Sequence, residues 1–353
     1  MTHFDPNAAA TKDSGIFGLP FTVEESKLIL IPVAWEATTS YGSGTFYGPQ
    51  AIFAASKQVD LYDRDLGNFF EAGIAMLEHS PHIQEWNAKA RTAALKIISE
   101  KIDDSQKNIL AALNAVNHYS EKLNKYIYNE TKKWLNQDKF VGLIGGDHSI
   151  PFGGIQSFLE KYPNMHVLHI DAHADMRQAY EGFEYSHASI MYNVITKTPL
   201  EKLIQVGIRD FCEDEAKFIE NNSVRISTFF DADLAEQKMI GRSWSSLCDD
   251  IIQHLGSEVY ISFDIDGLAP HFCPHTGTPV PGGLDFNEVL YLFKKIIQSK
   301  RKIIGFDLSE VSLGKITPHS SSGMVDPASE WDANVAARLL YKLCGWTLYS
   351  YEH

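Results

Sequence analysis

The chain has 353 residues, of which 44% are hydrophobic and 22% are charged. Asp and Glu number 45 against 31 Lys and Arg, so the formal net charge is −14 at pH 7. This apolar content excludes a disordered chain. The acidic surplus, without any Lys/Arg-rich run, disfavours binding to nucleic acid. No run approaches the roughly 18–20 consecutive apolar residues that a membrane span needs.

The N-terminal region and the cysteines indicate the cellular compartment. Residues 1–20 are polar and lack the basic and apolar segments of an export signal. The four cysteines are scattered without a CxxC pair, which indicates neither a disulfide framework nor a zinc–thiolate site. We therefore expect a cytoplasmic protein that binds neither nucleic acid nor a membrane.

Short apolar segments rich in β-branched residues alternate with longer helical patterns along the chain. Continuous apolar strands separated by helices are typical of a parallel sheet covered on both faces. The strands are expected at Leu28–Val33, Phe140–Ile144, Met165–Ile170, Leu203–Val206, Val259–Phe263 and Lys302–Phe306. The helices are expected at Pro49–Ser56, Pro151–Lys161, Asp214–Asn221, Trp244–Leu255, Phe286–Ser299 and Ser329–Leu343.

The segment from Glu78 to Gln137 has a different pattern. Apolar residues recur every three or four positions, which predicts one or two long amphipathic helices, interrupted near Asp103 and Asp104. The polar positions carry charges of both signs. This favours a helical hairpin packed on the domain over a membrane or calmodulin-binding surface.

The domain organisation follows from these patterns. No Pro/Gly/Ser-rich linker, internal repeat or low-complexity tract divides the chain. We predict one α/β domain over residues 1–353, built as three α-β-α layers around a central, mostly parallel sheet. Residues 1–27 form an N-terminal extension of this domain, and residues 78–137 form an extra helical segment.

Acidic and imidazole side chains follow three of the expected strands at the point where each strand ends. The runs are Gly145-Gly-Asp-His-Ser149, Asp171-Ala-His-Ala-Asp175 and Asp264-Ile-Asp-Gly-Leu268. Loops converge above the carboxyl ends of parallel strands, so these groups are expected in one crevice. Alternate positions of a strand point the same way, which brings the acidic groups of each run together. Carboxylates crowded in an apolar crevice repel one another, and a bound cation removes this repulsion.

The donor types indicate which cation would bind. Four Asp and two His form an oxygen-dominated set of donors, which indicates Mn²⁺ rather than a zinc ion bound only by sulfur. Six ligands are too many for one catalytic ion that keeps an open position, and they suffice for two ions bridged by shared carboxylates. Two neighbouring residues are interpreted as structural: Asp147 as a loop-holding cap, and His169 because strand alternation is taken to send it to the opposite face.

The three runs together resemble the signatures of the ureohydrolases, the family of arginases and agmatinases, in order and in spacing. Thr276–Gly283 and Thr38–Pro49 resemble further segments of the family. The resemblance covers about residues 28–63 and 140–345. It implies an arginase-like fold, hydrolysis of a small cationic guanidino compound to urea and an amine, and a homo-oligomer, often a trimer or hexamer.

The resemblance also implies two Mn²⁺ ions per chain. One ion would be bound by His148, Asp171, Asp175 and Asp264. The other would be bound by Asp171, His173, Asp264 and Asp266, with Asp171 and Asp264 bridging. Two cations lower the pKa of a bridging water, so that hydroxide is available near neutral pH to attack the guanidinium carbon.

Four further residues match positions that act on the substrate in this family. Glu310 resembles the carboxylate that pairs with the guanidinium group. His187 matches the histidine that carries a proton to the leaving amine, and we count it with Glu310 and Asp175 as catalytic. Thr278 resembles a substrate-binding residue and is equally compatible with a structural loop threonine. Arg177 could meet a substrate carboxylate or pair with acids of its loop.

The loop after the second signature indicates the substrate. Residues 176–186 lack the polar groups with which arginases hold the α-amino and α-carboxylate groups, and they resemble agmatinases. Agmatine is therefore the expected substrate, with guanidinobutyrate, guanidinopropionate, guanidine, arginine and formiminoglutamate as alternatives. Two residues depart from the common family pattern: Ala269, where many members have Asp, and Phe46, where Arg is common.

Two other functional classes are less compatible with the residues. A non-catalytic scaffold of the same fold would tend to lose ligands, and all six are present. A zinc hydrolase acting on acyl-lysines would need fewer carboxylates, and Glu310 speaks against it. His271, Cys273 and His275 lie in a Pro-bounded loop without a fourth partner, so their proximity in sequence is interpreted as incidental.

Overall fold

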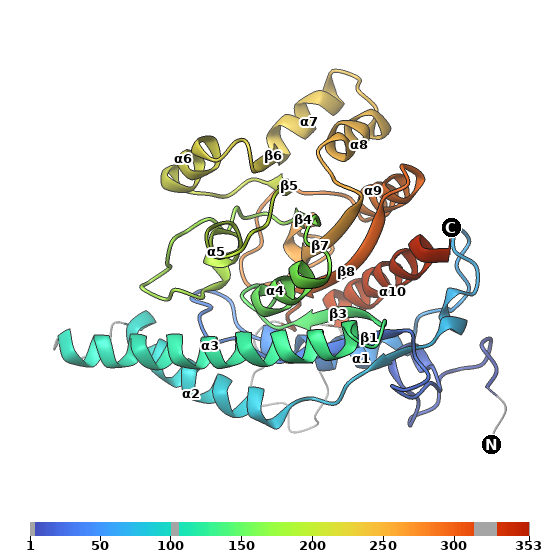
Figure 1. The fold of residues 1–353 in the computed structure, drawn as a ribbon, viewed down its shortest axis with the longest axis horizontal. Coiled ribbons are helices and arrows are strands. Elements are labelled where there is room, and N and C mark those ends of the chain that lie inside the picture. The colour runs from blue at the N-terminus through green and yellow to red at the C-terminus, as the bar shows by residue number, and fades with distance from the viewer. Residues whose placement is uncertain (1–3, 100–105, 314–329, 353) are drawn as a thin grey trace.

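The computed structural model describes residues 4–99, 106–313 and 330–352. Its centre is one eight-stranded sheet in the order β2-β1-β3-β8-β7-β4-β5-β6 (Figure 1). Every strand pairing in it is parallel. The strands are β1 Leu28–Val33, β2 Ile74–Met76, β3 Phe140–Gly145, β4 His166–Ile170, β5 Leu203–Ile208, β6 Ile226–Phe230, β7 Glu258–Asp264 and β8 Lys302–Ser309.

Helices cover both faces of this sheet, as predicted for a three-layer α/β arrangement (Figure 1). Alternate residues of one strand enter different cores: Leu28 and Leu30 pack on one side, and Ile29 and Ile31 on the other. The helices are α1 Gly48–Ser56, α2 Pro81–Ile98, α3 Gln106–Leu135, α4 Phe152–Lys161, α5 Ile190–Lys197, α6 Glu213–Asn221, α7 Asp231–Met239, α8 Trp244–Gln253, α9 Phe286–Gln298 and α10 Glu330–Glu352.

The six predicted strands and the six predicted helices are confirmed, and most of their ends agree within one or two residues. Four elements lie outside the predicted set: β2, α5, β6 and α7. The first has only three residues, and β6 is an edge strand in which only Ile226 is fully buried. Helices α5 and α7 are short, with eight and nine residues. The last helix runs on to Glu352, and its predicted first residue, Ser329, lies outside the described residues.

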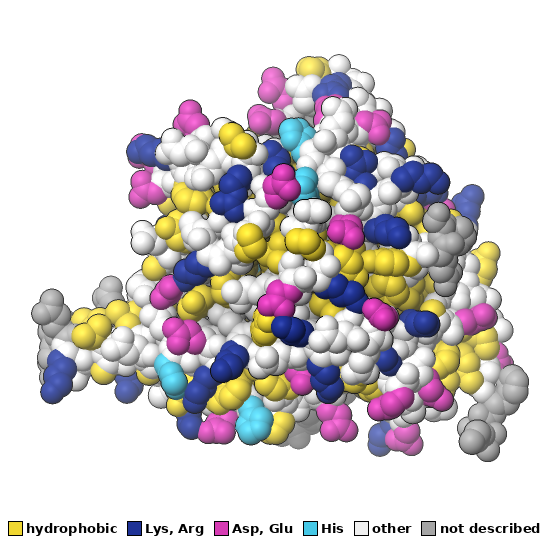
Figure 2. All heavy atoms as spheres, in the orientation of Figure 1, with side chains coloured by type: hydrophobic (Ala, Val, Ile, Leu, Met, Phe, Trp, Pro, Cys, Tyr) yellow, Lys and Arg dark blue, Asp and Glu magenta, His cyan; other side chains and the backbone are white. Residues whose placement is uncertain are grey.

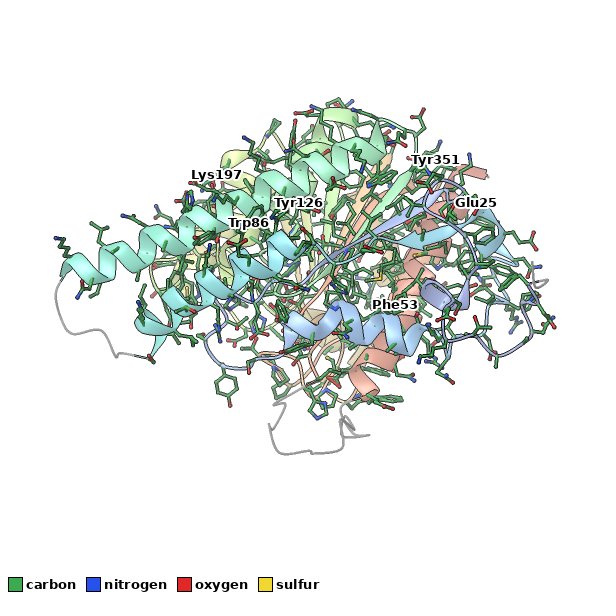
Figure 3. All side chains as sticks on the ribbon, turned by 90° about the horizontal axis from the view of Figure 1, so that it is seen from below. Glu25, Phe53, Trp86, Tyr126, Lys197 and Tyr351 are labelled. Atoms are coloured by element: carbon green, nitrogen blue, oxygen red, sulfur yellow. The ribbon has the colours of Figure 1, made fainter. Side chains whose placement is uncertain are left out.

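The predicted helical segment at 78–137 forms α2 and α3, which lie side by side (Figure 3). Their interruption was expected near Asp103 and Asp104, which lie outside the described residues. One end of the helical pair extends beyond the rest of the molecule (Figure 1). Between its two helices lies a small apolar cluster of its own, to which Phe183 from a distant loop contributes.

The surface carries acidic and basic side chains that are interspersed on the face drawn in Figure 2. Within residues 4–99, 106–313 and 330–352, none of the helices combines the length and the apolar character that crossing a bilayer demands.

Candidate active site

Four adjacent strands in the middle of the sheet bring the predicted residues together. Strand β3 pairs with β8, β8 with β7, and β7 with β4. Because these strands are parallel, their carboxyl ends lie along one edge, where ligands bind in open α/β sheets. The residues that follow them line one pocket, together with loops from elsewhere in the chain. Strand geometry, rather than proximity in sequence, thus assembles the site.

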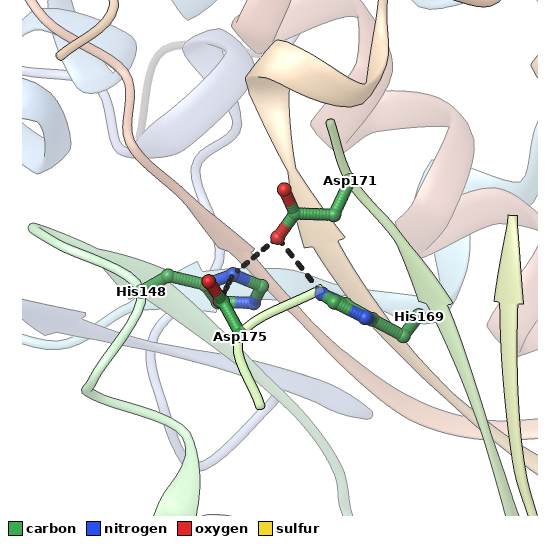
Figure 4. A group of neighbouring side chains, drawn as sticks. All are labelled: His148, His169, Asp171 and Asp175. Carbon is green, nitrogen blue, oxygen red and sulfur yellow. Dashed lines mark hydrogen bonds and ion pairs between the residues drawn. The ribbon is translucent and has the colours of Figure 1, made fainter. Parts of the chain in front are cut away.

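One group of buried donors surrounds the ring of His148 (Figure 4). Its Nδ1 atom lies 3.0 Å from Oδ2 of Asp171, 3.2 Å from Oδ2 of Asp175 and 3.4 Å from Oδ2 of Asp264. Its Nε2 atom is 2.9 Å from the hydroxyl oxygen of Ser262. Nδ1 therefore faces three carboxylates, while Nε2 contacts Ser262 of strand β7.

A second group of donors surrounds His173. Its Nδ1 atom lies 3.2 Å from Oδ2 of Asp266 and 3.5 Å from Oδ1 of Asp171. Asp171 thus presents Oδ1 to this group and Oδ2 to the group around His148. The structure brings all six predicted ligands to one place, with Asp171 between the two groups.

The backbone orients two of these carboxylates before any ligand binds. Oδ1 of Asp264 accepts the N–H of Asp266 at 2.9 Å, and its Oδ2 points to His148. Oδ1 of Asp266 accepts the N–H of Ala172 at 3.0 Å, and its Oδ2 points to His173. Each side chain therefore has one oxygen fixed by the main chain and one directed into the site.

The electrostatics of the cluster favour a bound cation. Burial, together with the charges of Asp266 and Asp171, raises the pKa of Asp264 well above its usual range. Burial and the charge of Asp171 raise the pKa of Asp175 to about 6. Desolvated anions held this close destabilise one another unless a positive charge is shared among them. A set of carboxylates and imidazoles in this arrangement fits divalent metal ions.

The structure corrects the prediction for His169. Residues 169 and 171 are two apart on a strand, so their side chains share a face, and Nε2 of His169 lies 2.8 Å from Oδ2 of Asp171 (Figure 4). On its other side, the amide nitrogen of Gln205 lies 3.1 Å from Nδ1 of His169. An amide nitrogen only donates, so Nδ1 accepts and Nε2 donates to Asp171. His169 therefore supports the shared carboxylate directly.

Asp147 agrees with its interpretation as a loop-holding residue. Its Oδ1 atom accepts the N–H of Ser149 at 3.0 Å and the hydroxyl of the same residue at 2.5 Å. Asp147 is fully buried and does not line the pocket. It fixes the turn from which His148 projects.

Glu310 follows β8 and enters the pocket beside the cluster. Its Oε1 atom accepts the N–H of His148 at 2.8 Å, and its own N–H donates to the carbonyl of Gly146 at 2.8 Å. The backbone at Glu310 is left-handed, with φ of 63°, a conformation that is costly for a side chain of this size. Burial and the charge of Asp147 raise the pKa of Glu310 above its usual range. This carboxylate is thus rigidly held and short of a cationic partner.

His187 lies on another wall of the pocket, just before α5. Its Nδ1 atom is 3.4 Å from the hydroxyl of Thr38 and 3.4 Å from the hydroxyl of Ser186. Burial, aided by the charges of His173 and His148, lowers the pKa of His187 to about 4. The ring is therefore neutral near pH 7 and can accept a proton.

Arg177 pairs with an acid, although not one from its own loop. Its Nε atom lies 3.6 Å from Oε2 of Glu215, in the first turn of α6. Glu215 is buried and also accepts the N–H groups of Met176 (3.0 Å) and Cys212 (2.9 Å). The positive charge of Arg177 is thus matched by a fixed negative charge.

The residues with weaker predictions have varied positions. Thr278 lines the pocket. Ala269 donates its N–H to the carbonyl of Leu284, and Phe46 packs against Tyr47 outside the residues that line the pocket. His275 pairs with Asp332, and no grouping of possible metal ligands within the described residues includes it or its neighbours.

Sequence reasoning missed several residues of the pocket mouth. Asp210 and Phe211 follow β5, and Tyr41 comes from the loop after β1. The rule that found the other residues, polar groups at the carboxyl end of a strand, also applies to Asp210. Glu215 carried a different signal, because an acid three residues into a helix is typical of a capping box.

Comparison with known proteins identifies the family of the chain. The sequence model of the Arginase family matches residues 26–343. An N(1)-aminopropylagmatine ureohydrolase of Thermus thermophilus is 30% identical over 290 residues, which are 82% of this chain and 84% of that protein. An agmatinase of Bacillus cereus is 26% identical over 289 residues, with the same two coverages.

A solved structure supports the fold independently. The proclavaminate amidino hydrolase of Streptomyces clavuligerus superposes with a TM-score of 0.69 at 23% identity, over 98% of this chain and 100% of that chain. The arginase-like α/β fold predicted from the sequence is confirmed. The chain therefore belongs to the arginase family, and it is a hydrolase of amidino carbon–nitrogen bonds, as its motifs predict.

Proposed function

We propose that this ureohydrolase cleaves agmatine to putrescine and urea, with two Mn²⁺ ions held by His148, Asp171, His173, Asp175, Asp264 and Asp266. The observation that carries the proposal is one pocket with two kinds of acid. Inside the pocket, one set of carboxylates lies next to the rings of His148 and His173. Glu310 also lines the pocket, but it does not belong to this set. The cluster suits metal ions, and the separate carboxylate suits a guanidinium group.

The metal ligands divide into the two groups described above. His148, Asp171, Asp175 and Asp264 would hold one ion, and Asp171, His173, Asp264 and Asp266 the other, with Asp171 and Asp264 shared. Bound divalent ions supply a water-derived nucleophile at neutral pH. Manganese is favoured over zinc because the donors are mainly carboxylate oxygens, without a thiolate.

Glu310 would bind and orient the guanidinium group. Its carboxylate is fixed by the N–H of His148, and burial together with the charge of Asp147 raises its pKa. A carboxylate can accept two parallel N–H groups from a guanidinium cation. This pairing would hold the planar substrate carbon over the metal ligands, with its leaving nitrogen turned towards the pocket mouth.

His187 would transfer a proton to the leaving amine. Burial lowers the pKa of His187 to about 4, so the ring is neutral near pH 7 and would hold a proton only briefly while it passes to the leaving nitrogen. The hydroxyls of Thr38 and Ser186 lie near its Nδ1 atom, which leaves Nε2 for the substrate. Asp175 and Glu310 complete the catalytic set by holding the metal and the guanidinium group respectively.

The pocket mouth supports a substrate whose far end is positive. The side chain of Asp210 is 67% exposed at the mouth, and Phe211 and Tyr41 offer aromatic rings beside it. An ammonium group is attracted both to a carboxylate and to an aromatic face. Arg177 is engaged by Glu215, which makes it a weak candidate for binding a substrate carboxylate. These charges favour agmatine over guanidinobutyrate, guanidinopropionate or formiminoglutamate.

A second substrate is favoured by a specific observation. The Thermus relative of 30% identity is named for N(1)-aminopropylagmatine, which extends agmatine by an aminopropyl group. The open, acidic and aromatic mouth at Asp210, Phe211 and Tyr41 could receive this second cationic segment. Thr278, which also lines the pocket, would then contact the shared guanidinobutyl portion.

The test is a substrate panel with the Mn²⁺-loaded protein. Urea release is measured with agmatine, N(1)-aminopropylagmatine, arginine, guanidinobutyrate, guanidinopropionate and guanidine, and formamide release with formiminoglutamate. We expect the highest kcat/KM with an amine-terminated substrate and a fall of about 10²-fold or more in Glu310→Gln. Turnover confined to arginine, to guanidine or to the carboxylate-terminated compounds would contradict the proposal.

The assembly and compartment are also part of the proposal. We expect a cytoplasmic homo-oligomer, a trimer or a hexamer, that binds neither nucleic acid nor membranes. Light scattering coupled to size-exclusion chromatography measures the mass directly, and a value equal to one 39.6 kDa chain would contradict the oligomer.

A further inference from the structure

The helical pair α2–α3 contacts two separate loops that form walls of the pocket. The first wall is the segment 36–41 after β1, which contributes Ser40 and Tyr41. The second is the loop 176–187 after β4, which contributes Arg177, Tyr180 and His187. Neither α2 nor α3 itself lines the pocket. The helical pair therefore stands behind the walls of the site.

Helix α2 holds the first wall through polar contacts with its backbone. The side-chain oxygen of Asn87, which is buried, accepts the N–H of Glu36 at 2.7 Å. One turn further along the helix, Nη1 of Arg91 donates to the carbonyl of Ala37 at 3.3 Å and to the carbonyl of Thr39. These bonds fix the main chain on both sides of Thr38, whose hydroxyl lies near His187.

Helix α3 holds the second wall through a tight hairpin. Tyr180 and Phe183 exchange backbone hydrogen bonds of 3.2 and 2.8 Å around a left-handed turn. Phe183 is fully buried in the apolar cluster between α2 and α3. A Cβ atom on Gly182 would lie only 2.9 Å from Leu113, so the turn sits directly against the helix. The next N–H, of Glu184, donates to Asn117 at 3.1 Å.

The two walls meet at a catalytic residue. Thr38 of the first wall lies 3.4 Å from the ring of His187 in the second. Arg91 binds the backbone of the first wall, and its charge partly offsets the burial that raises the pKa of Glu181 in the second. Figure 3 shows the helices lying side by side beneath the sheet, with Trp86 and Tyr126 between them. A shift of α2 against α3 would therefore move both walls and the proton-transfer group together.

We propose that Asn87, Arg91 and Asn117 are positioning residues, through which the helical pair sets the place of His187 and the width of the pocket mouth. The proposal rests on the proposed function, because it assigns these residues a part in that reaction. The metal ligands follow strands of the sheet and have no such contact with α2 or α3 among the described residues. Positioning of the walls is thus separable from metal binding.

The experiment compares Arg91→Met and Asn117→Leu with the control Lys96→Met. Lys96 lies on the exposed side of α2, so its substitution removes the same charge from the same helix. We expect Arg91→Met and Asn117→Leu to lower kcat/KM by about 10-fold or more, since small displacements of catalytic groups are costly. Manganese content and the thermal midpoint should match the control. Arg91→Lys and Asn117→Asp, which keep a donor and an acceptor respectively, should restore most of the activity.

A second measurement works whether or not the substrate is correctly identified. Hydrogen–deuterium exchange followed by mass spectrometry should show faster exchange in peptides covering 36–41 and 177–187 in both variants. Peptides covering 140–150 and 259–266 should be unchanged. If the wild-type protein turns over nothing in the panel, the proposed function fails while this exchange pattern still tests the contacts. Unchanged exchange in the two walls, or faster exchange with unchanged kcat/KM in an active enzyme, would overturn the positioning role.

Discussion

The strand ends and the helical pair contribute to one pocket in opposite ways. At the strand ends, the side chains themselves enter the site, and the backbone of the sheet holds them. In α2 and α3, side chains bind the backbone of other loops, and those loops supply the groups in the site. A substitution at the strand ends therefore removes a group that takes part in the reaction. The helical pair can change the shape of the pocket while the chemistry stays in place.

The largest expected effect is at the shared ligand. Asp171→Asn should lower kcat by about 10³-fold and also lower manganese content, because removing one charge of a buried group costs about 3–5 kcal/mol. Activity and metal content are measured on the same sample, with the exposed Asp138→Asn as control. Full metal content with lost activity would place Asp171 outside the metal-binding set. The strand ends would then differ less from the helical pair, which affects activity without binding metal.

The next effect concerns the residue behind that ligand. His169→Phe removes the donor to Asp171, and loss of such outer partners lowers metal affinity by about 10–100-fold. At saturating Mn²⁺ most of the activity should return, in contrast to Asp171→Asn. A manganese titration monitored by electron paramagnetic resonance measures the affinity, with the exposed His118→Phe as control. Equal affinity in both variants would show that His169 only fills space.

A smaller effect is expected at the pocket mouth. Asp210→Asn should raise KM for agmatine by about 5-fold, since a partly exposed charge pair contributes roughly 1 kcal/mol. KM for free guanidine, which has no far end, should not change. Steady-state kinetics with both substrates separates these cases. A fall in kcat with both, at constant KM, would instead mean that Asp210 acts on His173, which lies 3.9 Å away.

A further effect is a pH dependence of metal binding. In the metal-free protein burial raises the pKa of Asp175 to about 6, and only its ionised form binds a metal ion. Protonation of Asp175 alone should therefore raise the manganese dissociation constant about 3-fold between pH 6.5 and pH 5.5. His148 and His173, whose pKa values the surrounding carboxylates raise, must also give up protons when the metal binds, which steepens this dependence. Calorimetric titrations at pH 5.5, 6.5 and 7.5 measure it. A constant affinity over this range would mean that neither the carboxylate nor the two imidazole rings loses a proton when the metal binds.

Much of the site could be predicted because its signals are local. Asp171, His173 and Asp175 alternate within five residues, and the parallel strands before and after them are plainly apolar. Side chains two positions apart on a strand share a face, so the sequence also places His169 beside Asp171. The prediction that His169 lies on the opposite face was therefore wrong. The same local rule extends to Asp210, at the end of β5.

The rest of the site could not be predicted because it depends on distant contacts. Asn87 and Arg91 are ordinary polar residues of an amphipathic helix, and only tertiary packing brings them to the backbone at 36–39. The partner of Arg177 was equally hidden, since Glu215 lies 38 positions away on another helix. Short elements such as β2 escaped for a simpler reason, because three residues carry no period.

The parallel arrangement of β3, β4, β7 and β8 has one more consequence. The ligands lie at 148, 171–175 and 264–266, so the centre exists only after segments more than a hundred positions apart have paired. An ion captured there would tie the three strands β3, β4 and β7 into one cooperative unit, and its binding energy would add to the folding free energy of the whole sheet. Heat resistance of this enzyme should accordingly follow the supply of free ion.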